Sequence, residues 1–134
     1  MCIMSDDNTK SQIYGVRCKD LLDEDGIRFS GIINEAGVLI HGGFKKGILP
    51  LESDQVKLES FMKFVSKMSL RKEFDGSLGP INYLVARRDK VVLISFPFPL
   101  SSIILLISAE PTINIENLAS KVTKIFGGTS LSSN

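Results

Sequence analysis

The order of the apolar segments constrains the fold of this chain more than any single motif does. Two short strand-like segments precede one long amphipathic helix, and three closely spaced strand-like segments and a last amphipathic helix follow it. A further helical pattern lies before the first strand. The sequence therefore predicts helix, two strands, helix, three strands and helix, an α/β domain of the α+β type.

Length and composition favour a single packed domain. The 134 residues are 43% hydrophobic and 23% charged, which is typical of a globular chain rather than a disordered one. The net charge of +1 provides no overall attraction to nucleic acid. We expect a flexible segment over residues 1–12, the domain over 13–126 and a flexible tail over 127–134.

The cysteines and the first residues favour the cytoplasm. Cys2 and Cys18 form no CxxC motif and fit a reduced protein better than a disulfide scaffold. The start of the chain lacks the basic region and apolar run of a secretory signal. We therefore expect a cytoplasmic protein.

One uncharged stretch, residues 91–109, is long enough to raise the question of a membrane helix. Pro97 and Pro99 interrupt its centre, and a proline inside a helix costs about 3 kcal/mol. The stretch is also rich in valine and isoleucine, which favour strands. We predict two buried strands joined at residues 97–101 and no membrane span, with a membrane hairpin as the alternative.

Five strands are predicted from short apolar runs that end at turn residues. They are residues 27–33, 38–44, 81–86, 91–96 and 103–109. Gly37 provides the turn between the first two strands, because glycine readily adopts a positive φ.

Three helices are predicted from apolar residues spaced three and four apart. The first follows a cap at Asp6, Asp7 or Asn8, and the second spans about residues 52–72. The third spans about residues 115–125 and follows a cap at Thr112 or Asn114.

The second helix has a wider apolar face than packing on a sheet requires. This face comprises Leu58, Phe61, Met62, Val65 and Met68. Phe64 widens the apolar arc to roughly 160°, against about 100° for a helix that packs on a sheet. Two interpretations remain open: Phe64 and Met68 fill the core, or they form an interface.

Basic residues recur on the opposite side of this helix and in a later turn. They are Lys63, Lys67 and Arg71 on the helix, and Arg87, Arg88 and Lys90 in the turn. One joint patch would suit an acidic partner, a nucleic acid or an anionic membrane. Because no aromatic residues alternate with these positions, we expect no nucleic-acid binding and favour a solvated helix face and a charged turn.

No residue pattern predicts a catalytic, cofactor-binding or metal site. His41 has no nucleophile or further ligand at a recognisable spacing. Cys18 lies on the apolar face of the first helix, where a buried thiol is expected. The glycine pairs match neither phosphate-binding motif, and residues 23–25 lack the length of a calcium loop.

Four segments together resemble the Roadblock/LC7 family, within the profilin-like and longin-like group. They are residues 31–40, 52–72, 81–96 and 102–110, within a resemblance that covers residues 14–126. The resemblance implies a five-stranded antiparallel sheet with helices on its faces. It also implies dimers that pair their central helices and join edge strands, with residues 81–86 as the edge strand. Members act as scaffolds or regulators of small Ras-like GTPases or as dynein light chains, without catalytic residues.

The resemblance also indicates which residues would meet a second copy or a partner. They are Phe64, Met68, Lys63, Lys67, Arg71, Ile81 and Tyr83. The family's central helix is often rich in small residues, whereas this one carries Phe61, Met62, Phe64 and Met68. A looser dimer or another partner is therefore the alternative to close pairing of the helices.

Three functions follow as hypotheses. The first is a non-enzymatic domain that forms a homodimer and binds a small GTPase. The second is a small-ligand sensor like profilin or PAS domains, which would need an enclosed apolar pocket between sheet and helices. The third is an enzyme, which would need His41 or Cys18 to converge with other polar groups in a cleft.

Overall fold

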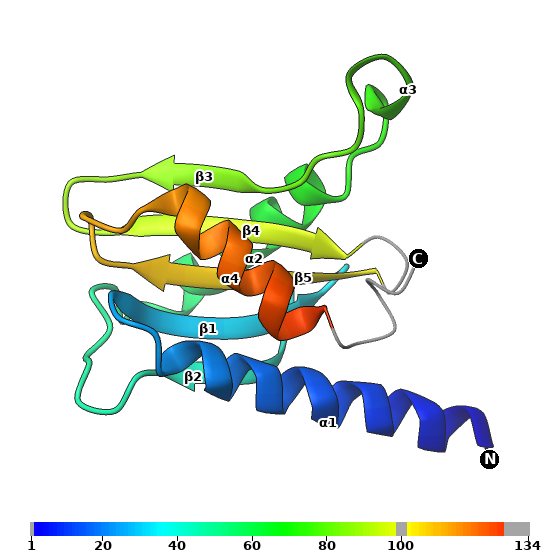
Figure 1. The fold of residues 1–134 in the computed structure, drawn as a ribbon, viewed down its shortest axis with the longest axis horizontal. Helices are drawn as coiled ribbons and strands as arrows, with labels where there is room; N and C mark the ends of the chain where they lie inside the picture. Colours follow the sequence, from blue (N-terminus) through cyan, green and yellow to red (C-terminus); the bar gives the residue numbers. More distant parts are fainter. Residues whose placement is uncertain (1, 99–101, 128–134) are drawn as a thin grey trace.

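The computed structural model describes residues 2–98 and 102–127 and contains the predicted order of elements (Figure 1). Its elements are α1 (Cys2–Leu22), β1 (Ile27–Asn34), β2 (Leu39–Phe44), α2 (Gln55–Ser69), α3 (Asp75–Leu78), β3 (Leu84–Arg87), β4 (Val92–Phe98), β5 (Ile103–Ala109) and α4 (Ile115–Phe126). The short α3 was not predicted, because Gly76 and Gly79 made this segment resemble a helix breaker. Parts of the predicted tail and of the predicted 97–101 connection lie outside the described residues.

The strands form one antiparallel sheet in the order β2-β1-β5-β4-β3. This confirms the predicted α+β fold with a five-stranded sheet. Helices α1 and α4 cover one face of the sheet and α2 covers the other (Figure 1). The edges of the sheet are β2 and β3.

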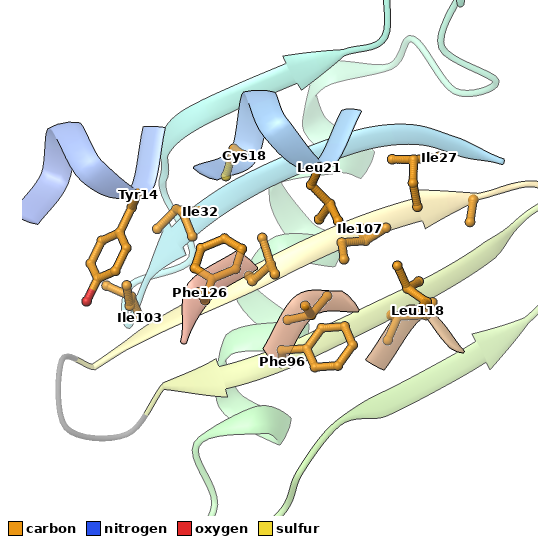
Figure 2. Packing of buried hydrophobic residues seen from close by; sticks show 14 of the residues in the cluster. Tyr14, Cys18, Leu21, Ile27, Ile32, Phe96, Ile103, Ile107, Leu118 and Phe126 are labelled. Carbon is orange, nitrogen blue, oxygen red and sulfur yellow. The ribbon is translucent and has the colours of Figure 1, made fainter. Parts of the chain in front are cut away.

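The larger core lies between the sheet and the helices α1 and α4 (Figure 2). Tyr14, Cys18 and Leu21 of α1 and Leu118 and Phe126 of α4 point into it. The smaller core lies under α2, where Val65 packs on residues of β1 and β5. β5 is buried along its whole length, because it lies in the middle of the sheet between the two cores.

Two helices begin where a side chain caps them. The Asp54 carboxylate accepts hydrogen bonds from the backbone N–H groups of Val56 and Lys57, so α2 begins at Gln55 and not near residue 52. The Asn114 side chain caps α4, one of the two predicted positions. In contrast, α1 begins at Cys2, ahead of the predicted caps Asp6, Asp7 and Asn8, because no glycine or proline precedes them to end the helix.

The strands next to the β3 edge differ most from the prediction. β3 begins at Leu84 and not at Ile81, because Gly79 and Pro80 lead the chain past the sheet before it can pair. β4 continues through Pro97 to Phe98. The missing N–H of Pro97 is tolerated there because β4 pairs with β3 only up to Ser95, and beyond it with β5 alone.

The turn between β1 and β2 holds α2 in place. The Ser66 hydroxyl of α2 donates to the carbonyl oxygens of Asn34, at 3.3 Å, and Glu35, at 2.6 Å. Gly37 has a φ of 81°, and a Cβ at this position would lie 2.6 Å from the Cα of Lys63. The contact fixes how α2 is rotated about its axis, and with it which residues face outward.

Replacing Gly37 by alanine should therefore destabilise the fold through both φ and the contact with α2. The matched control is Gly47→Ala, because Gly47 has a φ of 85° but no atom within 4 Å of the added Cβ. We expect Gly47→Ala to lower the free energy of unfolding by about 1–2 kcal/mol. Gly37→Ala should cost about 1–3 kcal/mol more, because α2 must move. Urea unfolding measures both, and equal losses would contradict the tight contact.

Candidate functional site

Helix α2 presents exposed apolar and basic residues on different sides. Ser66 and Lys63 contact the β1–β2 turn, on the side of the sheet away from β3. Phe64 and Met68 lie roughly 160° around the helix axis from Ser66. They therefore lie on the flank of α2 that faces β4 and β3, and the Ser69 hydroxyl contacts Ser95 of β4 at 2.9 Å.

The bulky residues of α2 have different environments. Phe61 and Met62 are half-buried against the smaller core, and Met68 is also half-buried. Phe64, in contrast, is 61% exposed. Most of the apolar arc thus packs on the sheet, whereas Phe64 does not. That Phe64 and Met68 form an interface remains a prediction.

The edge next to this flank is open. Within the described residues, β3 pairs with β4 and has no strand on its other side. Leu84 lies opposite Ser95 and shares the face that α2 covers, yet Leu84 and Leu93 are only half-buried. Val85, on the other face, is 39% exposed. We call Phe64, Met68, Leu84, Ala86 and Leu93 the α2–β3 surface.

Tyr83 and Ile81 do not belong to this surface. Both precede β3, and Tyr83 packs on the opposite face, with its ring 5.6 Å from that of Phe96. Its hydroxyl donates to the Glu116 carboxylate of α4, which raises the pKa of Tyr83. Their predicted place beside Phe64 assumed an edge strand that begins at Ile81, three positions before the observed start of β3 at Leu84.

The basic residues form two groups rather than one patch. Lys63 lies beside the β1–β2 turn, at the end of the sheet where Asn34 pairs with Ile103. Arg87 lies at the other end, where its guanidinium donates to the carbonyl oxygen of Pro111 at 2.7 Å. Lys63 and Arg87 thus lie at opposite ends of the sheet, which agrees with the favoured interpretation of a solvated helix face and a separate charged turn.

The basic residues of α2 also differ in their partners. Lys63 and Lys67 are exposed and form no ion pair within the described parts of the chain. Arg71 donates from Nε to the Glu73 carboxylate, and this hydrogen bond lowers the pKa of Glu73. Two unpaired cations thus remain on the outward side of α2.

A groove of about 310 Å³ lies on the sheet face that α4 covers, between α4 and the C-terminal half of β4. Its lining residues are Asn82, Tyr83, Phe96, Pro97, Phe98, Ala119, Val122, Thr123 and Phe126. Four aromatic rings make it mostly apolar, and it is half-open rather than enclosed between sheet and helices.

Cys18 and His41, which the enzyme hypothesis requires, both lie where α1 meets the sheet. Cys18 is 1% exposed, and burial raises the pKa of its thiol from 9.0 to about 11. His41 of β2 packs against α1, where a Cβ on Gly15 would lie 3.2 Å from the histidine Nδ1. Over residues 2–98 and 102–127, no three His, Cys, Asp or Glu side chains are grouped for a metal ion. None of the helices in these ranges has the length and apolar character that a membrane crossing requires.

A second exposed apolar surface was not predicted. Leu39 and Phe44 of β2 form it, because they pair with Ile33 and Phe29 on the sheet face that carries α2. Further exposed apolar residues close by in the chain are Val38, Ile40, Leu49 and Leu51. α2 packs mainly on β1, β5 and β4 and leaves β2 with little cover.

The raised pKa of Cys18 predicts a pH dependence of stability. The unfolded thiol ionises near pH 9.0 and the folded one near pH 11, so the unfolded chain releases its proton first. Stability that is present below pH 9 is therefore lost as the pH rises to about 11. Compared in a Cys2→Ser background, Cys18→Ala should show a shallower decline of the unfolding free energy over this range. Parallel declines in urea titrations would contradict the assignment.

Comparison with known proteins identifies the fold and the family. No curated protein matches this sequence. The Roadblock/LC7 domain from Streptomyces avermitilis superimposes with a TM-score of 0.63 at 11% identity, over 84% of this chain and 91% of that one. The gliding protein MglB from Thermus thermophilus gives 0.62 at 12% identity, over 90% and 93%. Myxococcus xanthus MglB gives 0.59 at 13% identity, over 92% and 93%.

These likenesses show that the chain has a Roadblock/LC7-like fold. Residues 4–130 match the model described as "Family of unknown function (DUF6659)". The chain belongs to this family.

Proposed function

We propose that this protein is a non-enzymatic interaction domain that forms a homodimer and binds a small Ras-like GTPase as a scaffold or regulator, in the cytoplasm. The observation that carries the proposal is the exposed Phe64 on the flank of α2 that is turned toward the β4–β3 side of the sheet, where the edge of β3 is open. An exposed aromatic residue next to an unpaired strand is costly to leave in water and is typical of an interface.

A second copy fits this edge in a specific way. Two β3 strands paired across a two-fold axis would join two sheets into one, with each α2 on the same side. The Phe64 flanks of the two helices would then face each other above Leu84 and Ala86. Self-association has a precedent within this fold, because one MglB structure has a tetrameric arrangement.

The environments of the candidate catalytic residues support a non-enzymatic role. A thiol must ionise to act as a nucleophile, and the pKa of Cys18 is raised far above neutral pH. His41 is held against α1 rather than in a cleft. The GTPase part of the proposal is supported by the Roadblock/LC7-like fold, whose members act on small GTPases. The exposed Lys63 and Lys67 would set orientation and association rate.

Replacing Phe64 by aspartate should dissociate the dimer without unfolding the chain. A charge at the centre of the interface would be buried without a partner, so we expect the dimer dissociation constant to rise about tenfold or more. Sedimentation equilibrium measures the constant, and circular dichroism confirms the fold. Val56→Asp is the matched control, because Val56 is a 75% exposed apolar residue of α2 that points outward and away from β3. It should change the constant less than threefold.

Two results would contradict this assignment. If Phe64→Asp unfolds the chain, Phe64 belongs to the core. If both substitutions weaken the dimer equally, or the wild-type protein is monomeric at micromolar concentrations and above, the α2–β3 surface is not the dimer interface.

The GTPase partner is tested by capture from native lysate. Tagged protein is incubated with lysate that contains either GDP or a non-hydrolysable GTP analogue, and bound proteins are identified by mass spectrometry. We expect a small GTPase to be enriched in one nucleotide state. Recovery of no GTPase in either state would contradict the regulator function.

A small-ligand sensor is the second candidate, and the groove of about 310 Å³ favours it. Its volume lies at the lower end of the range for small-molecule sites, and aromatic rings line it. Its half-open shape fits the sensor hypothesis less well than an enclosed pocket would. A sensor would bind its ligand without the α2–β3 surface, so Phe64→Asp would leave ligand binding unchanged.

A further inference from the structure

We infer that the outward face of α2 docks an acidic α-helix of a protein partner. This inference rests on the proposed function, because it specifies the chemistry of the partner that the same helix would bind. It is carried by the charge distribution around α2 and by the geometry of Lys63 and Lys67.

Charge is concentrated around α2 in an otherwise nearly neutral protein. The cations within residues 55–72 are Lys57, Lys63, Lys67, Arg71 and Lys72, and the single carboxylate is Glu59. All six of these side chains are exposed. Lys57 pairs with Glu52 and Arg71 pairs with Glu73, which leaves Lys63, Lys67 and Lys72 as the cations of this segment with no ion pair among the described residues. The surface field of α2 therefore attracts an acidic partner.

Lys63 and Lys67 form the centre of this basic face. They are one helical turn apart, at a spacing of about 6 Å, and point away from Val65, which packs in the smaller core. Like charges at this spacing destabilise a helix by about 0.2–0.5 kcal/mol. Neither lysine has an ion pair within the described residues to offset that cost. The two lysines thus form no ion pair that stabilises the monomer among the described residues.

An acidic helix complements this geometry. Carboxylates at positions i and i+4 of a partner helix repeat at the same spacing of about 6 Å and would meet both ammonium groups at once. The exposed Val56 lies on the same outward side and adds an apolar contact. Such a contact would neutralise the repulsion between the lysines that the free protein carries.

A second copy of α2 fits this face poorly. If two copies paired through the outward faces of their α2 helices, the lysines of one copy would repel those of the other. Dimerisation through the Phe64 flank leaves these outward faces free. That dimer would place two basic faces side by side and double the charge that a partner meets. The outward face therefore suits a partner rather than self-association.

The apolar residues argue for a protein rather than a bilayer or a nucleic acid. The apolar stripe of α2 is packed on the sheet, so the outward face has no stripe left to enter a membrane. Ser60 and Glu59 lie between the cations, and no row of aromatic side chains is available on the described part of α2 to stack with bases.

The test uses the full chain and a synthetic alanine-rich helical peptide with glutamates at i, i+4 and i+8. A second peptide has the same composition, with its glutamates distributed around the helix. We expect the first peptide to bind at least fivefold more tightly by fluorescence anisotropy and to shift the amide resonances of α2. Binding should weaken as salt is raised.

The combined substitutions Lys63→Glu and Lys67→Glu should weaken binding of the first peptide about tenfold or more. The matched control combines Lys19→Glu and Lys124→Glu, which change the net charge equally on exposed residues of α1 and α4. The control should change binding less than twofold. Equal losses in the two variants, or equal affinity for the two peptides, would overturn the inference. Lysine-dependent binding to phosphatidylserine vesicles together with no peptide binding would overturn it in favour of a membrane.

Sedimentation separates this inference from the proposed function. The Lys63 and Lys67 variant should keep the dimer constant of the wild type, because the outward face is not the dimer interface. If the protein is monomeric but the peptide still binds α2, the homodimer fails and the acidic partner stands. If the dimer forms through Phe64 but no peptide binds, the inference of an acidic partner is refuted and the proposed homodimer is kept.

Discussion

The contact between the β1–β2 turn and α2 determines what this protein presents to its surroundings. Only glycine at position 37 lets the turn approach the Lys63 backbone, and the Ser66 hydroxyl then binds two carbonyl oxygens of that turn. These contacts fix the rotation of α2 on the sheet. A different rotation of this helix would bury Phe64 or turn the lysines toward the sheet. The exposure of Phe64 and of the α2 lysines therefore depends on the β1–β2 turn, although no residue of this turn belongs to either surface.

The unequal covering of the two sheet faces explains where apolar side chains remain exposed. Two helices share the face of the larger core, and one helix serves the other face. α2 contacts β1, β5 and β4, so the face of β3 and that of β2 lie at its sides with little cover. Phe64 and the half-buried Leu84 lie on one side, and Phe44 and Leu39 lie on the other. Both exposed apolar surfaces thus follow from one helix lying on a sheet that is wider than the helix can cover.

Most of the fold could be predicted from the sequence because its signals are local. The β5 boundaries follow from an unbroken apolar run, and Gly37 and Asn114 mark a turn and a cap directly. The errors arose where pairing decides the structure. Ile81 has the residue type of a strand, but no neighbouring strand pairs with it in the described part of the chain. Pro97 seemed to end β4, yet that position needs no hydrogen bond toward β3.

The candidate site was less predictable because it depends on which residues share a side of the folded chain. Helical periodicity correctly placed Lys63 and Lys67 on the side of α2 opposite to Val65, because positions within one helix follow from its repeat alone. It could not place Arg87 at the far end of the sheet, nor turn Tyr83 toward α4, because those positions depend on strand register.

The bulky residues of α2 bear on how closely two copies can approach. The sequence alone suggested that Phe61, Met62, Phe64 and Met68 together would keep two central helices apart. In the structure, Phe61 and Met62 pack toward the sheet, so they place no bulk between neighbouring helices. Phe64 and Met68 alone occupy the flank toward β3. A dimer of the proposed kind would therefore be governed by one aromatic contact beside a strand edge, while the unpaired lysines stay outward and free for a partner of opposite charge.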